Sequence, residues 1–164
     1  MNENKLGAMQ VSCVQMHWAR SLERNLELTR KFIAQAAREG SRVVLFPEAS
    51  LTGYYFPYAV KLSRQTVIAA LEEAARAAAE NNIWAIVGSI RAWKDKFLNL
   101  AHVIDPSGSV TYEYAKVQLA GEDERRYCIP GDKVAFFRIG DVDCALSICR
   151  DGRHPELFQI PAML

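Results

Sequence analysis

Apolar residues in the first part of the chain follow strand and helix spacings in turn. Residues 8–16 alternate loosely between apolar and polar side chains, as in a strand, and residues 22–36 carry apolar side chains at helical spacing. Ser21 is a typical N-cap for that helix, and Gly40 supplies a stop after it. Residues 43–46 are apolar throughout, which is typical of a strand covered on both faces. The pattern predicts a strand, a helix and a second strand parallel to the first.

The middle of the chain repeats this order and then changes to a hairpin pattern. Residues 63–81 place an alanine-rich apolar stripe on one helical face, with charged residues outside it. Residues 83–88 read as the next buried strand. Residues 97–104 and 109–115 flank the sequence Asp-Pro-Ser-Gly, which suits a type I turn. We therefore expect an antiparallel hairpin after the third strand.

The last part of the chain is predicted to be a loop, two strands and a helix. Residues 118–132 are mostly polar and read as a loop, followed by strands at residues 134–138 and 142–148. A final helix is expected to begin near Pro155, because proline is tolerated in a first helical turn. No internal repeat, low-complexity tract or linker interrupts the sequence, so we expect residues 1–164 to form a single α/β domain.

Composition and charge indicate an ordinary soluble protein. The chain of 164 residues is 50% hydrophobic and 24% charged. Its 20 basic and 19 acidic residues give a net charge of +1, so no overall field would draw it to nucleic acid or an anionic membrane. No apolar run approaches the length of a membrane span, and the N-terminus lacks the features of a signal peptide. We expect a cytoplasmic protein that binds a small molecule.

Neither disulfides nor a metal site is expected. The four cysteines contain no CxxC pair, and the cytoplasm would keep thiols reduced. The three histidines, His17, His102 and His154, are scattered without the spacing of metal ligands. Metal catalysis is therefore not predicted.

The ends of three predicted strands carry chemically useful side chains, namely Glu48, Lys116 and Cys149. Each has an ordinary alternative, because the first could be a surface carboxylate, the second a solvated lysine and the third a structural thiol. In an extended strand Cys144 and Cys149 point to opposite faces. We therefore interpret Cys144 as the core thiol and Cys149 as a reactive thiol with a lowered pKa.

Four sequence blocks stand out along the chain: FPEASLTGY (46–54), YAKVQL (114–119), ERRYCIPGD (124–132) and LSICRDGRHPEL (146–157). In order and spacing they resemble the signature blocks of the carbon-nitrogen hydrolase family, also called the nitrilase superfamily. The resemblance implies an α-β-β-α sandwich, in which two sheets stack face to face with helices outside. Family members continue well past the cysteine, so we expect this chain to be C-terminally truncated. A sheet face left exposed would favour association, and a homo-oligomer is expected.

The resemblance also implies a catalytic triad. Cys149 would be the nucleophile, Glu48 the general acid-base and Lys116 the cation that stabilises the oxyanion. Glu48 follows an apolar strand and a proline, and the resulting partial desolvation suits a carboxyl that accepts and releases a proton near neutral pH.

Further residues are expected to contact the substrate. Glu124 resembles a family glutamate that orients the lysine and the substrate, and the backbone N–H of Arg150 would be a second oxyanion donor. Tyr54 ends the first block and is expected to bind substrate. Two positions depart from the family pattern, which often has histidine where this chain has Gln118 and an aromatic residue at Arg150. These departures affect substrate identity rather than the class of reaction.

The predicted function is hydrolysis of a non-peptide carbon-nitrogen bond in a small amide, N-carbamoyl compound or nitrile. The reaction would pass through a cysteine acyl-enzyme and require no metal or organic cofactor. Two alternatives stay open. The chain could be a catalytically silent fragment that acts at most as a binding module, or it could transfer the acyl group to an amine rather than to water.

Overall fold

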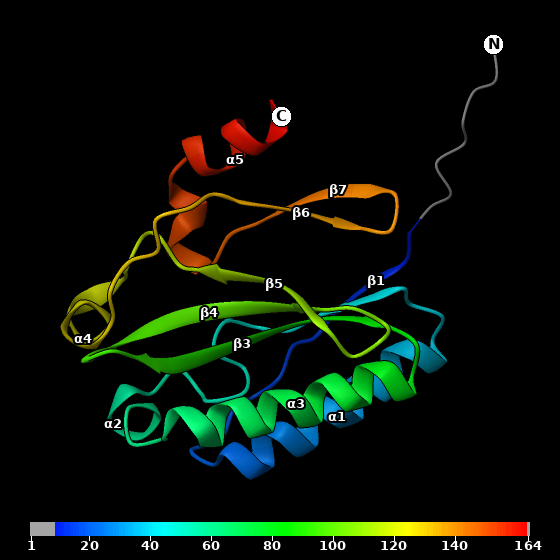
Figure 1. Cartoon of the computed structure of the whole chain (residues 1–164), viewed down its shortest axis with the longest axis horizontal. Coiled ribbons are helices and arrows are strands. Elements are labelled where there is room, and N and C mark those ends of the chain that lie inside the picture. The colour runs from blue at the N-terminus through cyan, green and yellow to red at the C-terminus, as the bar shows by residue number, and fades with distance from the viewer. Residues whose placement is uncertain (1–8, 164) are drawn as a thin grey trace.

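Two β-sheets form the centre of the computed structural model, which describes residues 9–163 (Figure 1). The larger, five-stranded sheet contains, in spatial order, β1 (Val11–Cys13), β2 (Val43–Leu45), β3 (Trp84–Trp93), β4 (Lys96–Ile104) and β5 (Val110–Ala115). The first three strands are parallel and the last two are antiparallel to their neighbours. The predicted parallel pair and the predicted hairpin after the third strand are both confirmed.

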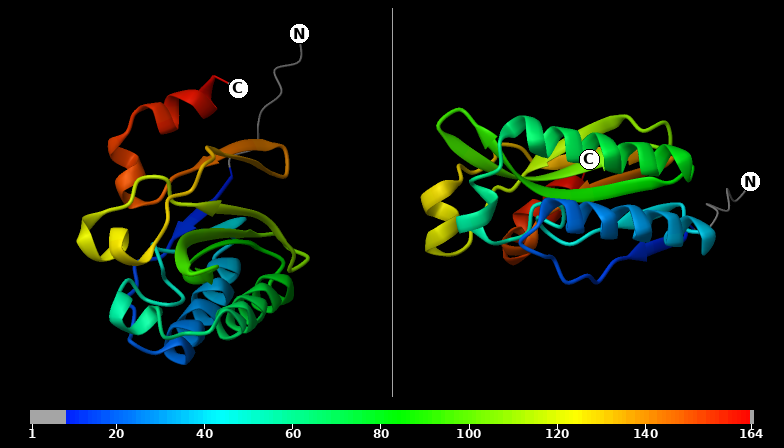
Figure 2. Two further views of the ribbon diagram at one scale, coloured as in Figure 1. Left: turned by 60° about the vertical axis from the view of Figure 1, so that its left-hand side comes forward. Right: turned by 90° about the horizontal axis from the view of Figure 1, so that it is seen from below.

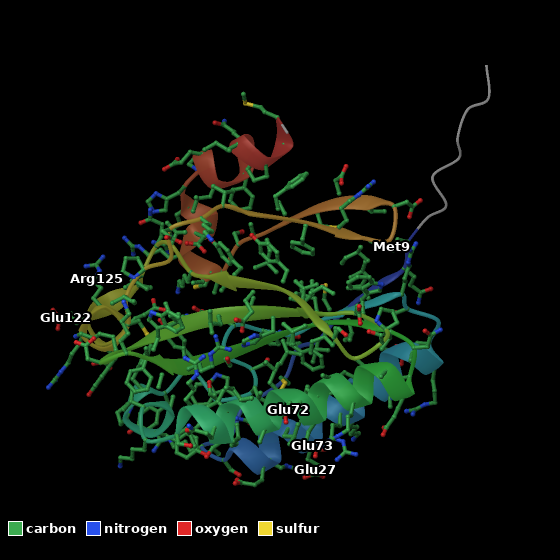
Figure 3. All side chains as sticks on the ribbon, viewed as in Figure 1. Met9, Glu27, Glu72, Glu73, Glu122 and Arg125 are labelled. Atoms are coloured by element: carbon green, nitrogen blue, oxygen red, sulfur yellow. The ribbon has the colours of Figure 1, made fainter. Side chains whose placement is uncertain are left out.

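Two long helices cover one face of this sheet. They are α1 (Leu22–Arg38) and α3 (Arg64–Glu80), and each begins at a serine N-cap whose hydroxyl accepts a backbone N–H from the first turn. The alanine-rich stripe of α3 is buried against the sheet, as predicted from its spacing. Charged residues such as Glu27 and Glu72 lie at the surface (Figure 3).

The other face of the large sheet packs against a two-stranded sheet, β6 (Ala135–Ile139) and β7 (Val142–Leu146). Buried side chains from both sheets meet there, including Val103 and Phe137. Helix α5 (Glu156–Ala162) lies beyond the small sheet, so the order of layers is helices, sheet, sheet and helix (Figure 2). This is the expected α-β-β-α sandwich.

Several element boundaries differ from the sequence prediction. Strand β3 continues to Trp93 and pairs with β4 through a tight turn, because residues 89–93 form ladder bonds that their mixed polarity did not indicate. Helix α4 (Gly121–Tyr127) replaces part of the predicted polar loop, and the short helix α2 (Phe56–Ala59) was also missed. The first strand is shorter than residues 8–16, and Ala8 lies outside the described residues.

Among the helices of residues 9–163, none is long and apolar enough to cross a membrane. In the same residues, no group of three or more His, Cys, Asp and Glu side chains could hold a metal ion.

Candidate active site

A buried ion cluster lies where the carboxyl ends of β2 and β5 meet β4. The side chain of Lys116 is 0% exposed, and its Nζ donates to Glu48 Oε1 at 2.6 Å and to Glu124 at 3.2 and 3.0 Å. Two carboxylates thus surround one ammonium group. Glu48 is the more exposed of the two acids, at 17%, whereas the Glu124 side chain is 0% exposed. The structure brings together two of the three predicted triad residues in direct contact.

The backbone around Glu48 is held by β3. The N–H of Leu51 donates to the carbonyl of Gly88 at 2.9 Å, so the segment after β2 continues to follow β3. A Cβ atom at Gly88 would lie 2.5 Å from the backbone nitrogen of Ala49, and only glycine permits this close approach. Ala49 itself has a φ of 51°, an uncommon conformation for a residue with a side chain. The close approach to Gly88 and the conformation of Ala49 therefore fix the backbone turn that holds the Glu48 side chain.

Glu124 comes from the helix that the sequence pattern missed. It lies in α4, it is 1% exposed, and its carboxylate also accepts the backbone N–H of Ala120. A carboxylate that accepts a backbone N–H just before a helix is a favourable arrangement for the helix N-terminus. This contact explains why a segment rich in polar residues forms a helix here.

Asn99 is a site residue that sequence reasoning missed. Its Nδ2 donates to Glu48 Oε1 at 2.7 Å and to Glu124 Oε1 at 2.6 Å. The backbone N–H of Lys116 donates to the carbonyl of Asn99 at 2.9 Å, which aligns the two residues on adjacent strands. The signal available in the sequence was a single amide side chain inside the apolar run of residues 97–104.

Cys149 is exposed and lies just beyond the strand predicted over residues 142–148, which ends two residues earlier than predicted. Strand β7 ends at Leu146, and Cys149 opens the 3-10 helix η1 (Cys149–Arg153) with a φ of 46°. The buried carboxylate of Asp151 holds this turn by accepting the N–H of Ile148 at 3.0 Å and the hydroxyl of Tyr114 at 2.8 Å. A strained backbone conformation at an exposed thiol is a frequent feature of functional sites.

Asp151 also ties the cysteine turn to the lysine segment. Its Oδ1 accepts the backbone N–H of Gln118 at 2.7 Å, two residues after Lys116. Sequence reasoning missed this role, because an aspartate beside Cys149 carries no signal that it would be fully buried.

The charge environment raises two pKa values at the site. Burial alone would lower the pKa of the Lys116 ammonium, but the hydrogen bonds and charges of Glu48 and Glu124 outweigh it and raise the pKa. Burial raises the pKa of the Cys149 thiol, and the charge of Glu48 adds to this effect while Lys116 opposes it. The expected lowering of the Cys149 pKa is therefore wrong, because burial and the charge of Glu48 both raise it.

The other cysteines differ in burial. Cys128 is the most buried thiol, at 4% exposed, and burial raises its pKa to about 12. Cys144, the predicted core thiol, is half-buried and packs against the core between the sheets. Cys13 is exposed, as is Cys149.

Two cavities adjoin the ion cluster. A cavity of about 130 Å³ is lined by both Glu48 and Cys149. A second cavity, of about 620 Å³, is lined by Tyr54 and Glu124. Burial raises the pKa of Tyr54, and the charge of Glu124 adds to this effect. The ring centroid of this tyrosine lies 5.6 Å from Lys116 Nζ.

Arg150 is placed in sequence beside the thiol, within η1. In the described part of the chain its side chain forms no ion pair with the other site residues. Its side chain is therefore not part of the buried cluster.

Sequence comparison places the chain among known hydrolases. Residues 10–162 match the carbon-nitrogen hydrolase family. A hydrolase of Schizosaccharomyces pombe is 30% identical, over 94% of this chain and 52% of its own length. The omega-amidase NIT2-B of Xenopus laevis is 32% identical, over 84% of this chain and 53% of its own length. The chain thus spans about half the length of these relatives.

Structural comparison gives the same fold. A mutant of the Nesterenkonia AN1 amidase, a protein of the nitrilase superfamily, superposes with a TM-score of 0.87 and is 24% identical. The superposition covers 94% of this chain and 60% of the amidase. The layered sandwich is therefore shared with that structure. Since the family match covers nearly all of the described residues, the chain belongs to the carbon-nitrogen hydrolase family.

Proposed function

We propose that the site hydrolyses the carbon-nitrogen bond of a small carboxamide through an acyl-enzyme on Cys149. The observation that carries this proposal is the cavity shared by Glu48 and Cys149, with Lys116 bonded to the same glutamate. A thiol, a carboxylate and a fixed cation are the groups that acyl transfer needs as nucleophile, base and oxyanion partner.

In the first half of the reaction, Glu48 takes the proton of the Cys149 thiol as the sulfur bonds to the carbonyl carbon. The electron pair of the C=O bond moves to oxygen, and the negative charge there is stabilised by Lys116 and by the backbone N–H of Arg150. When the C=O bond re-forms, the C–N bond breaks and the leaving nitrogen takes the proton from Glu48. Ammonia and a thioester on Cys149 are the products of this half.

In the second half, Glu48 takes a proton from water as the oxygen attacks the thioester. The tetrahedral intermediate collapses, the C–S bond breaks, and the proton held by Glu48 returns to the sulfur. The net change is water and amide to carboxylic acid and ammonia, with Cys149 and Glu48 restored. A raised thiol pKa is compatible with this sequence, since the proton leaves only as the new bond forms.

Amides are the favoured substrate class among those considered. Omega-amidases are among the relatives, and the Nesterenkonia amidase has been solved in complex with butyramide. Glu124 and Tyr54 line the larger adjoining cavity and are proposed to bind the part of the substrate beyond the reacting carbon. N-carbamoyl compounds and nitriles would require the same nucleophile and serve as comparison substrates.

Ammonia release from butyramide tests the proposal. The chain and its variants Cys149→Ala and Glu48→Gln are compared at equal concentrations of folded protein. We expect Cys149→Ala to abolish release and Glu48→Gln to reduce it about 100-fold or more. Normal release by either variant would remove that residue from the mechanism. Release of an acyl-amine product in place of acid would indicate transfer, and no release by the parent chain would favour the silent binding module.

A further inference from the structure

We propose that Asn99 is a positioning residue that selects Glu48 Oε2 as the oxygen that accepts the Cys149 proton. This inference rests on the proposed function, because it assigns a role within the same reaction. The geometry of a single amide group between two carboxylates supports it.

The amide nitrogen of Asn99 carries two hydrogens and faces two acceptors. Nδ2 lies 2.7 Å from Glu48 Oε1 and 2.6 Å from Glu124 Oε1. Lys116 Nζ donates to the same Oε1 of Glu48 at 2.6 Å. One oxygen of Glu48, Oε1, therefore has two donors, whereas neither Asn99 nor Lys116 donates to Oε2. Oε2 belongs to the residue that shares a cavity with Cys149.

The orientation of the amide is fixed by its surroundings. Asn99 is 1% exposed, and its Oδ1 has no hydrogen-bond partner among the described residues. Turning the amide over would direct that oxygen at two carboxylate oxygens, which would repel it. The fold thus leaves one buried acceptor unsatisfied while both N–H groups face Glu48 and Glu124. An unsatisfied buried polar atom at this place is typical of a functional site.

Other side chains of similar size could not do the same. An aspartate at position 99 would add a third negative charge beside Glu48 and Glu124. A serine could donate only one hydrogen, and an alanine none. Lys116 alone would then have to balance two carboxylates, and one of them would hold a proton more readily. An amide that donates to both keeps the base ionised and its second oxygen available.

Alkylation of Cys149 by methyl vinyl sulfone, which contains no carboxamide, measures this role without turnover. The rate is followed by mass spectrometry between pH 5 and 8 for the parent chain, Asn99→Ser, Asn99→Ala and Asn99→Asp. If Glu48 takes the thiol proton, the rate should rise with pH to a plateau, and the midpoint of that rise is the quantity compared. We expect the midpoint to move upward by about one pH unit in Asn99→Ala, since a hydrogen bond to a charged group is lost. Asn99→Ser should move it less and Asn99→Asp more.

Ser89→Ala is the matched control. Ser89 lies on the neighbouring strand β3, is fully buried, and hydrogen-bonds His102 on the opposite face of the sheet. Its removal should lower stability without moving the midpoint. Glu48→Gln should abolish the rise altogether, and a parent-like profile in that variant would overturn the proposed function itself.

Three results would overturn the inference about Asn99 alone. One is an unchanged midpoint in Asn99→Ala while Glu48→Gln loses the rise. Another is an equal upward shift in Ser89→Ala. The third is failure of all Asn99 variants to fold when Ser89→Ala folds, because the amide would then be a structural requirement.

Discussion

Two polar clusters lie on opposite faces of the large sheet, and they differ in their chemistry. The site cluster contains Glu48, Asn99, Lys116 and Glu124. The helix-side cluster contains Ser89, Arg91, His102 and Glu113. Both are largely removed from water. Burial and hydrogen bonding alone therefore do not distinguish a functional cluster from a structural one.

In the helix-side cluster, the charges of Arg91 and Glu113 balance each other. Arg91 binds Glu113 through two parallel contacts of 2.6 and 3.1 Å, and His102 Nδ1 lies 2.8 Å from the same carboxylate. Ser89 Oγ lies 2.8 Å from His102 Nε2. The order serine, histidine, glutamate is that of a hydrolytic triad, but Ser89 and His102 are 0% exposed. A substrate could not reach this serine.

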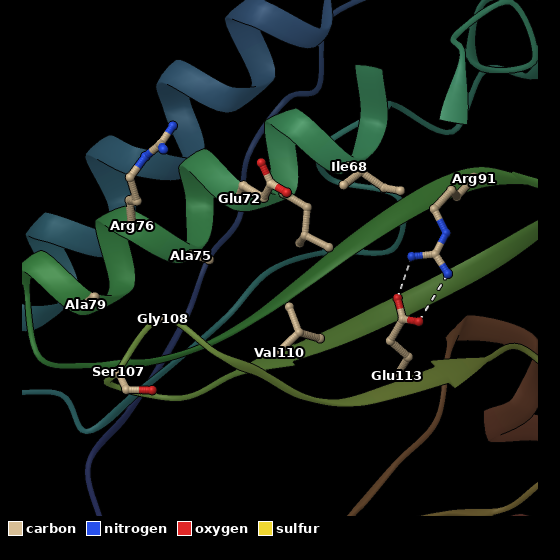
Figure 4. A pocket seen from close by; sticks show the side chains of 11 residues that line it. Ile68, Glu72, Ala75, Arg76, Ala79, Arg91, Ser107, Gly108, Val110 and Glu113 are labelled. Carbon is tan, nitrogen blue, oxygen red and sulfur yellow. Dashed lines mark hydrogen bonds and ion pairs between the residues drawn. The ribbon is translucent and has the colours of Figure 1, made fainter. Parts of the chain in front are cut away.

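The cavity beside this cluster is not lined by a thiol. It has a volume of about 620 Å³ and lies between α3 and the β4–β5 hairpin, with the Arg91–Glu113 pair at one end (Figure 4). By contrast, the site cluster has one more carboxylate than cation and adjoins an exposed thiol. The comparison shows that an unbalanced charge and an accessible nucleophile, rather than cavity size, indicate the site.

Replacing the central cation of each cluster should give the largest difference in activity between the two clusters. Lys116→Met removes the oxyanion partner, and we expect ammonia release to fall about 100-fold to 1000-fold. Arg91→Met should change release less than about twofold per folded molecule, since it lies on the other face. Turnover assays on both variants, corrected for the folded fraction, check this. Equal losses in the two variants would contradict the separation of the faces.

Stability should respond to the helix-side cluster. Arg91→Met leaves the partly buried carboxylate of Glu113 without its two hydrogen bonds from the guanidinium group. We expect the free energy of unfolding to fall by about 1 to 3 kcal/mol. Urea unfolding followed by circular dichroism measures the change. An unaltered urea midpoint would show that the ion pair contributes nothing to stability, which is often the case for exposed ion pairs.

Acid should weaken the fold through the same cluster. The hydrogen bond with His102 and those from Arg91 lower the pKa of Glu113 from 4.5 to about 2. Burial lowers the pKa of His102. In both cases the unfolded chain binds protons more readily, so stability falls with falling pH. We expect the loss of stability to begin near the ordinary histidine pKa of about 6.5 and to become steeper between pH 4.5 and pH 2. Urea midpoints at several pH values test this, and Glu113→Gln should flatten the dependence below pH 4.5.

A small effect on stability but a visible effect on association is expected at the outer face of the small sheet. Phe136 and Phe158 are 39% and 47% exposed and line one shallow cavity there. We expect Phe158→Ser to reduce self-association in light scattering while changing the free energy of unfolding by less than about 0.5 kcal/mol. A parent chain that stays monomeric at high concentration would contradict the prediction of a homo-oligomer.

The regular elements were predictable from the sequence because local signals agree there with the tertiary packing. Ser63 caps α3 and its alanine stripe packs on the sheet, so spacing alone located this helix. Helix α4 was missed because its apolar stripe is absent and its stability depends on Glu124, a residue paired with distant Lys116. The strand predicted over residues 142–148 ends early, at Leu146, because Asp151 forms a turn through contacts that no periodicity reveals.

The site was predicted less completely than the fold. The sequence blocks indicated Glu48, Lys116 and Glu124, which the structure gathers into one cluster. Asn99 and Asp151 act through hydrogen bonds to partners many residues away, and such pairs are set by strand register. The direction of the Cys149 pKa shift could not be read from the sequence, since it depends on the burial of the thiol and on the charges that the fold places around it.

The most direct test of the central claim compares two exposed thiols of the same chain. Cys149 shares a cavity with Glu48, whereas Cys13 is exposed on β1 away from that cavity. Labelling with methyl vinyl sulfone at pH 7, mapped by peptide mass spectrometry, should modify Cys149 at least about tenfold faster than Cys13. Glu48→Gln should remove this advantage and leave the Cys13 rate unchanged. Equal labelling of the two thiols, or an advantage that survives Glu48→Gln, would contradict activation of Cys149 by Glu48.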